Sequence, residues 1–290
     1  MQTIEVKRRS DFEPTVYKPV GEPKGLDFIG GNAIVTMGGK PVIVQRLLTR
    51  SLGSFKDALS RVRYHEGSRS RGLPTRSRVF GYLPRLTIRR DYCTITALAM
   101  ENPKEHAIIC QQAALVDSHY RSVNPELHRR HSELVEKVLP DWRLPGSVFT
   151  SGIANYNNPL RYHYDAGNFK GVWSAMLVSK DGVGGGALAV PELGLCFAVP
   201  DNSLLMFDGQ ALLHGVTPIQ GMEEGGSRHS VVFYSMEQMW RCDRPALELD
   251  RIRNQKTVRE QARASGESKS QIARRWKWTE QEGMTSDRPT

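Results

Sequence analysis

From residue 145 to about residue 240, hydrophobic residues come in short runs separated by turn-forming residues. The runs are rich in valine, phenylalanine and tyrosine, which favour pleated sheets, and glycine, proline, asparagine and aspartate lie between them. The sequences of the runs are SVFTSGIANY, VWSAMLVS, GALAVP, LCFAVP, SLLMFD and SVVFYSM. Short strands with this spacing predict an antiparallel β-sandwich or β-barrel.

Residues 102–139 have a different pattern, in which apolar and polar residues alternate at helical spacing. Pro125 follows Asn124, and proline is favoured in the first turn of a helix, so the segment predicts two successive helices. From Arg251 onward, helix-forming residues continue to a break at Gly266 and predict a helical tail. We therefore expect three regions: a basic and helical N-terminal region (1–144) that packs on the core, a β core (145–244) and a basic C-terminal helical tail (245–290).

Length and composition are those of a globular protein. The chain has 290 residues, 39% of them hydrophobic, which is enough to bury a core. No apolar stretch approaches the roughly 20 residues that cross a bilayer, and the N-terminus contains no apolar signal segment. We expect a cytoplasmic protein without a membrane partner.

The four cysteines are Cys93, Cys110, Cys196 and Cys242. They are widely spaced and form no C-x-x-C pair, which indicates neither a disulfide framework nor a zinc cluster. We therefore expect reduced thiols.

Positive charge is concentrated in two stretches of a chain whose formal net charge is +9. One is the basic tail, and the other, which we expect to be a loop region, contains Arg61, Arg63, Arg69, Arg71, Arg76, Arg78, Arg85, Arg89 and Arg90. Charge runs are commonly solvated faces. Arginine interspersed with Tyr64, Phe80 and Tyr82, or with Trp276 and Trp278 in the tail, would also suit phosphate contact and base stacking.

Three residues in the β region are candidate metal ligands. His163 and Asp165 are separated by one residue, which places both side chains on the same side of an extended segment, and His214 follows much later. Two imidazoles and one carboxylate on one face of an octahedron leave positions open for a cosubstrate and O2, as non-haem Fe(II) oxygenases require. Considered alone, the pair could be a surface histidine beside an acid. His214 alone could be a histidine of the apolar core.

A candidate anion clamp follows one hairpin after His214. Arg228 begins the run RHSVVFYSM, and Ser230 lies two residues later on the same face of the predicted strand. A guanidinium offers a fork of donors and the hydroxyl adds one more, which suits the far carboxylate of a dicarboxylic cosubstrate.

Three segments together resemble the oxygenase domain of the TET and JBP dioxygenases, which oxidise 5-methylcytosine and thymine in DNA. They are HYDAGN (163–168), GGGALAVPELGLCFAVPDNSLLMFDGQALLHGVTP and RHSVVFY (228–234). The resemblance extends over roughly residues 145–240 and, more weakly, over residues 76–93. It implies an α+β protein whose core is a double-stranded β-helix, or jelly roll, with flanking helices.

The resemblance also implies the cofactors, the partner and the roles of individual residues. Fe(II) would be bound by His163, Asp165 and His214, and 2-oxoglutarate by Arg228 and Ser230, with O2 as cosubstrate. The partner would be DNA with its methylpyrimidine flipped out of the stack. Asn168 matches the asparagine that bonds the flipped base, and Tyr234 matches a tyrosine beside it.

The sequence departs from the animal 5-methylcytosine oxidases at one base-reading position. Two residues after Tyr234, where those enzymes have a histidine, this chain has Met236, which forms no strong hydrogen bond. We expect hydroxylation of 5-methylcytosine, with thymine hydroxylation to 5-hydroxymethyluracil as the alternative. An oxygenase acting on protein or small molecules, or a DNA-binding module without activity, also remains open, and the oligomeric state is unknown.

Overall fold

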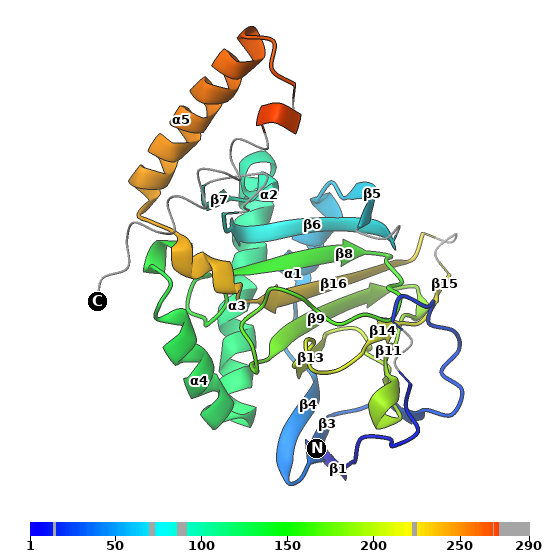
Figure 1. Ribbon diagram of the computed structural model, residues 1–290. Coiled ribbons are helices and arrows are strands. Elements are labelled where there is room, and N and C mark those ends of the chain that lie inside the picture. Colours follow the sequence, from blue (N-terminus) through cyan, green and yellow to red (C-terminus); the bar gives the residue numbers. More distant parts are fainter. Residues whose placement is uncertain (14–15, 70–72, 86–91, 222–224, 269, 273–290) are drawn as a thin grey trace.

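The computed structural model describes residues 1–13, 16–69, 73–85, 92–221, 225–268 and 270–272. Its largest element is a ten-stranded sheet (Figure 1). The strand order is β1 (Gln2–Glu5), β3 (Ala33–Met37), β4 (Lys40–Leu47), β13 (Ser203–Phe207), β9 (Ser174–Asp181), β16 (Ser227–Tyr234), β8 (Ser151–Tyr156), β6 (Leu73–Leu83) and β5 (His65–Arg69), and β7 (Thr94–Ile95) pairs with β6.

A smaller sheet faces part of the large one. Its strand order is β14 (Gly215–Val216), β11 (Leu188–Val190), β12 (Leu195–Phe197) and β2 (Asp27–Ile29), and β10 (Gly184–Gly185) pairs separately with β15 (Ile219–Gln220). The α-helices are α1 (Gly53–Arg61), α2 (Ala97–Glu101), α3 (Pro103–Val123), α4 (Pro125–Val135) and α5 (Pro245–Ala264). Short 3-10 helices are η1 (Pro140–Trp142), η2 (Pro191–Leu193) and η4 (Glu237–Arg241).

Alternation along β13 shows how the layers are arranged. Leu204 and Met206 belong to the apolar cluster formed with helices α1 and α3, whereas Leu205 and Phe207 belong to the cluster formed with the smaller sheet. Successive side chains of a strand point to opposite faces, so the large sheet has helices on one face and the second sheet on the other. This is the expected α+β architecture, with two facing sheets and flanking helices.

The two helices predicted between residues 102 and 139 are confirmed as α3 and α4. Pro125 occupies the first turn of α4, and the Asn124 side chain accepts a hydrogen bond from the Leu127 N–H as the N-cap. The predicted C-terminal helix is confirmed as α5, and Gly266 follows its end with a φ of +81°. No helix among the described residues is long and apolar enough to cross a membrane.

The basic stretch from residue 61 is not the expected loop. Most of its described part forms the hairpin of β5 and β6, and β6 pairs with β8 in the large sheet. Phe80 and Tyr82 are alternate residues of β6 that pack in the same apolar cluster, although arginine and serine dominate the composition around them. With β1, β3 and β4, these strands place much of the large sheet before residue 145.

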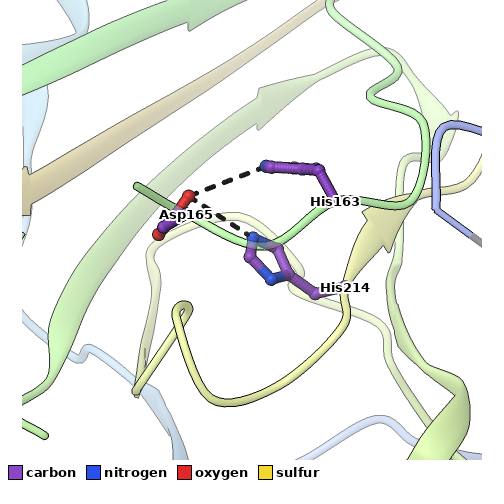
Figure 2. Close-up of side chains that lie close together, drawn as sticks. All are labelled: His163, Asp165 and His214. Atoms are coloured by element: carbon purple, nitrogen blue, oxygen red, sulfur yellow. Dashed lines mark ion pairs between the residues drawn. The ribbon is translucent and has the colours of Figure 1, made fainter. Parts of the chain in front are cut away.

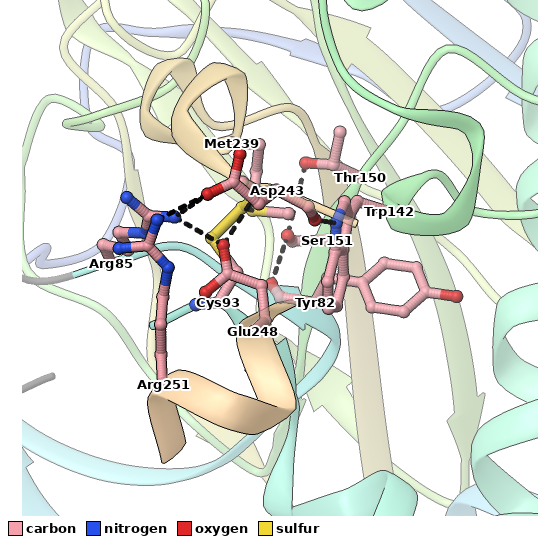
Figure 3. The surroundings of a disulfide bond; sticks show 11 residues. Tyr82, Arg85, Cys93, Trp142, Thr150, Ser151, Met239, Asp243, Glu248 and Arg251 are labelled. Carbon is pink, nitrogen blue, oxygen red and sulfur yellow. Dashed lines mark hydrogen bonds and ion pairs between the residues drawn. A yellow bond between two sulfur atoms is a disulfide. The ribbon is translucent and has the colours of Figure 1, made fainter. Parts of the chain in front are cut away.

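The expectation of four reduced thiols is wrong for two of them. Cys93 and Cys242 form a disulfide, although 149 residues separate them along the chain (Figure 3). The fold brings the start of β7 against the segment before α5, and the Cys93 N–H and the Asp243 N–H both donate to the buried Glu248 carboxylate. Arg85 forms ion pairs with Glu248 and Asp243 at the same place. Such a pairing depends on tertiary contacts, so spacing along the chain gave no sign of it.

Thiol titration should therefore distinguish the four cysteines. Denatured without a reductant, the oxidised protein should show two reactive thiols, from Cys110 and Cys196, which are free and buried in the native state. After reduction it should show four. Four reactive thiols before reduction would contradict the disulfide.

Candidate metal centre and its pocket

His163 and His214 lie directly opposite each other on two neighbouring segments. The His163 N–H donates to the His214 carbonyl at 2.9 Å, and the His214 N–H donates to the His163 carbonyl at 3.1 Å. In an antiparallel pair of this kind the two side chains project from the same face. Their rings accordingly lie side by side, with centroids 4.3 Å apart.

Asp165 completes the group. Its Oδ1 lies 3.7 Å from Nε2 of His163 and 3.8 Å from Nε2 of His214 (Figure 2). The three potential ligand atoms all lie within 4.8 Å of one another. The structure therefore brings together the three residues that the sequence indicated, in an arrangement that could hold one metal ion.

Backbone carbonyls fix the orientation of both imidazoles. Nδ1 of His163 donates to the Arg161 carbonyl at 2.8 Å, and Nδ1 of His214 donates to the Leu212 carbonyl at 2.9 Å. A carbonyl can only accept, so Nδ1 carries a proton in each ring, and Nε2 is the nitrogen that lies near Asp165. Histidines that bind metals are commonly held in this way.

Gly209 makes room for Asp165, and the sequence analysis did not single it out. A Cβ at Gly209 would lie 2.2 Å from Oδ2 of Asp165 and 3.2 Å from Cε1 of His214. The Gly209 carbonyl also accepts the Asp165 N–H at 2.8 Å. The segment FDGQ (207–210) thus positions the carboxylate.

The same turn holds the loop that follows Asp165. Asp208 accepts hydrogen bonds from the Gln210 and Ala211 N–H groups, and the Gln210 amide donates to the Asn168 and Phe169 carbonyls at 3.0 Å each. Burial raises the pKa of Asp208, while these N–H groups lower it. The turn therefore fixes the backbone on both sides of the candidate ligand loop.

Arg228 is fully buried, and no described residue pairs with its charge. Its side chain lies in β16 with no solvent exposure, and Nε and both terminal nitrogens have no hydrogen-bond partner among the described residues. Burial lowers its pKa to about 10. A buried cation without a partner is costly, so the site favours binding of an anion, which the described residues do not supply.

Two residues shape the space around Arg228. A Cβ at Gly186 would lie 2.6 Å from Cδ of Arg228, so the glycine-rich segment leaves room for the long side chain. The Asn157 side-chain oxygen accepts the Arg228 N–H at 2.6 Å, and the Asn157 N–H donates to the Arg228 carbonyl at 2.9 Å. Asn157 itself has a φ of +42°. The tight pairing fixes the start of β16, and sequence reasoning missed it.

A cavity of about 380 Å³ lies between the two sheets beside the three candidate ligands. The residues lining it include His163, Asp165, His214, Asn168, Ser230, Tyr234 and Met236. Arg228 lies two residues before Ser230 on the same face of β16. The cavity is thus lined by every candidate site residue from the sequence analysis except Arg228.

Tyr17 and Asn155 are among the other residues that line the cavity, and neither was predicted as a site residue. Tyr17 lies at its edge, with a φ of +66° and an N–H that donates to the Tyr162 carbonyl at 2.7 Å. Asn155 is almost fully buried, and its amide donates to the Ser230 carbonyl at 3.2 Å while its oxygen accepts from Asn158. Tyr17 precedes the resembling segments, and Asn155 reads as an ordinary strand residue, so the sequence carried no signal for either.

Residues 87–237, more than half of the chain, match the family Tet_JBP, the oxygenase domain of the 2OGFeDO superfamily. The chain belongs to this family. The prediction from the three resembling segments is therefore confirmed. Enzymes of the superfamily are dioxygenases that use Fe(II), 2-oxoglutarate and O2, and these are the cofactors of this Tet_JBP domain.

Individual relatives match parts of the Tet_JBP chain. Thymine dioxygenase JBP1 of Trypanosoma brucei brucei is 27% identical over 145 residues, covering 49% of this chain and 17% of the relative. The bifunctional helicase and thymine dioxygenase JBP2 of Trypanosoma brucei brucei (strain 927/4 GUTat10.1) is 31% identical over 121 residues, covering 41% and 11%. The chain thus spans less than a fifth of the length of these relatives.

A solved structure supports the fold of the Tet_JBP chain. NgTET1 in complex with 5mC DNA superposes with a TM-score of 0.57 at 11% sequence identity, covering 78% of this chain and 90% of NgTET1. The α+β fold with a jelly-roll core is thereby confirmed.

Proposed function

We propose that this chain hydroxylates the 5-methyl group of a pyrimidine in DNA, with 5-methylcytosine as the substrate and thymine as the alternative. The observation that carries the proposal is the convergence of two imidazoles and a carboxylate beside a cavity lined by β16, the strand that carries a buried guanidinium with no partner among the described residues. Two imidazoles and one carboxylate are the ligand set that non-haem Fe(II) oxygenases use, and the guanidinium suits the far carboxylate of a dicarboxylic cosubstrate. The relatives named as thymine dioxygenases support a methylpyrimidine in DNA as the substrate class.

In this proposal each group has one task. His163, Asp165 and His214 hold Fe(II), while Arg228 and the Ser230 hydroxyl bind the far carboxylate of 2-oxoglutarate. The iron, with 2-oxoglutarate and O2, supplies the oxidising power that an unactivated methyl group requires. The apolar walls of the cavity, among them Phe207 and Val232, keep water away from the reacting groups.

Asn168 and Tyr234 are proposed to contact the flipped base. Asn168 is bridged by backbone pairing to Met236, and its amide nitrogen donates to the Ser174 hydroxyl at 3.2 Å. Oriented in this way, its side-chain oxygen can accept from the 4-amino group of 5-methylcytosine or from N3–H of thymine. Met236 lines the cavity beside it and adds no strong hydrogen bond. The geometry therefore suits both bases.

The test is the oxidation of defined DNA. Two duplexes are compared: in the first, thymine is the only 5-methylpyrimidine, and the second contains both thymine and 5-methylcytosine. Each is incubated with the protein, Fe(II), 2-oxoglutarate and air, and the nucleosides are then measured by mass spectrometry. We expect 5-hydroxymethylcytosine from the second duplex, and 5-hydroxymethyluracil from both if thymine is the substrate. Turnover of 2-oxoglutarate without either product would reject DNA as the substrate and favour a protein or small molecule.

A further inference from the structure

The arginines between residues 61 and 90 were the first candidates for contact with DNA. Where their side chains are described, several are already engaged: Arg76 pairs with Glu66, the buried Arg78 with Glu101, and Arg85 with Glu248 and Asp243. Arg71, Arg89 and Arg90 lie outside the described residues, as does the Arg69 side chain. A guanidinium that is already paired with a carboxylate is less available to a phosphate. A second basic surface has cations without such pairs among the described residues.

That surface consists of Arg130, Lys137, Lys170 and Trp240, which we call the Trp240 surface. All four side chains are exposed, and Trp240 retains 37% of its accessible area. The Lys137 ammonium lies 5.0 Å from the Trp240 ring centre. Trp240 belongs to η4, the short orange helix next to α4 in Figure 1, and its indole N–H donates to the Leu134 carbonyl of α4 at 2.9 Å.

The Trp240 surface is continuous with the wall of the cavity. The Trp240 ring stacks on Phe169, with centroids 4.9 Å apart and planes 24° apart, and Phe169 directly follows Asn168. The Phe169 N–H donates to the Ser235 carbonyl at 2.8 Å, between the cavity residues Tyr234 and Met236. A DNA strand that contacts Trp240 would therefore lie next to the proposed base-binding residues.

Buried contacts make this wall rigid. Nε2 of His131 in α4 donates to the Ser235 hydroxyl at 2.9 Å, and that hydroxyl donates to the Val148 carbonyl at 2.6 Å. The His131 ring packs against Tyr120, Phe149 and Phe169, and burial lowers its pKa to about 3, so it stays neutral. A fixed wall allows the exposed surface and the cavity to act as one binding unit.

The cations of the Trp240 surface differ from those already engaged. Within the described residues, Arg130, Lys137 and Lys170 form no ion pair with a carboxylate. The Arg130 guanidinium lies over Gly171, 3.2 Å from where a Cβ would be, which places it beside Lys170. Arg129, the next residue of α4, is equally exposed but pairs with Glu133. Arg129 can therefore serve as a control for Arg130, because the two are adjacent in α4 but only Arg129 has an ion pair among the described residues.

We infer that the Trp240 surface binds the DNA strand that carries the target base, with its three cations on phosphates and Trp240 stacked against a sugar or an adjacent base. The inference rests on the proposed function. Clustered cations release counterions from DNA, and an exposed indole supplies a sequence-tolerant stacking face. The same contacts would help to offset the cost of flipping the base.

The test compares salt dependence. Affinity for a fluorescently labelled duplex that contains thymine and 5-methylcytosine is measured by anisotropy over a range of salt concentrations. The triple variant Arg130→Gln, Lys137→Gln, Lys170→Gln should lower the log–log salt slope by about 3 and the affinity by on the order of 100-fold at about 0.15 M salt. Arg129→Gln, which removes a charge from the same helix, should leave both close to the parent values, and thermal unfolding checks that each variant is folded.

The outcomes separate this inference from the proposed function. An unchanged slope in the folded triple variant, with the parent binding and oxidising DNA, overturns the Trp240 surface alone. The double variant Arg61→Gln, Arg63→Gln replaces two exposed arginines of the first basic stretch. If DNA affinity and the salt slope fall in this variant and not in the triple variant, the Trp240 surface is overturned as well. A parent that neither binds nor oxidises DNA overturns the proposed function itself.

Discussion

Gly209→Ala should lower the affinity for Fe(II) by about 10–100-fold, the range seen when a group that positions a metal ligand is changed. The new methyl group would lie 2.2 Å from Oδ2 of Asp165, closer than non-bonded carbon and oxygen atoms approach, and 3.2 Å from Cε1 of His214, which is a tight contact. The carboxylate must then move away from the imidazoles. Anaerobic calorimetric titration with Fe(II) measures the change.

Gly31→Ala is the matched control for that substitution. A Cβ at Gly31 meets no atom within 4 Å, and its φ is not in the left-handed region, so affinity for Fe(II) should stay at the parent value. If Gly209→Ala bound Fe(II) as tightly as this control, Asp165 would not be held as the structure shows, and its assignment as a ligand would be wrong.

Arg228→Met should abolish turnover of 2-oxoglutarate and at the same time stabilise the protein without ligand by about 1–4 kcal/mol. The parent buries a guanidinium with no partner among the described residues, whereas methionine fills similar space without a charge. In the parent with Fe(II), 2-oxoglutarate at about 100 times its dissociation constant should add roughly 2.7 kcal/mol, and the variant should gain almost none. Anaerobic denaturant unfolding with and without 2-oxoglutarate measures both effects.

Arg78→Met gives the comparison. Arg78 is also buried, but Glu101 neutralises it, so its removal leaves an unpaired carboxylate and should not stabilise the fold. The account of Arg228 would be contradicted by a destabilised Arg228→Met protein that 2-oxoglutarate still stabilises.

The sequence indicated the parts of the fold that depend on local pattern. Short β runs after residue 145, the helix start at Asn124 and Pro125, and the shared face of His163 and Asp165 all follow from strand and helix periodicity. His214 was also a candidate ligand from the sequence, but nothing local shows that it faces His163 across a backbone pair. Periodicity alone could not bring these distant segments together.

What the sequence did not indicate depends on contacts between distant segments. Gly209 matters because Asp165 lies against it, and Asn157 matters because it pairs with Arg228, although each reads as an ordinary turn residue. The Cys93–Cys242 disulfide joins segments 149 residues apart. The strands β5 and β6 were hidden because arginine and serine obscure the alternation along them.

The most direct test of the central claim is an anaerobic titration of the protein with Fe(II), followed by 2-oxoglutarate, monitored by visible absorption. The account predicts one Fe(II) per chain and a charge-transfer band that appears only when 2-oxoglutarate is added. The band should be lost in His214→Ala and in Asp165→Ala. A band of parental intensity in either variant would show that iron and 2-oxoglutarate bind elsewhere and would contradict the account.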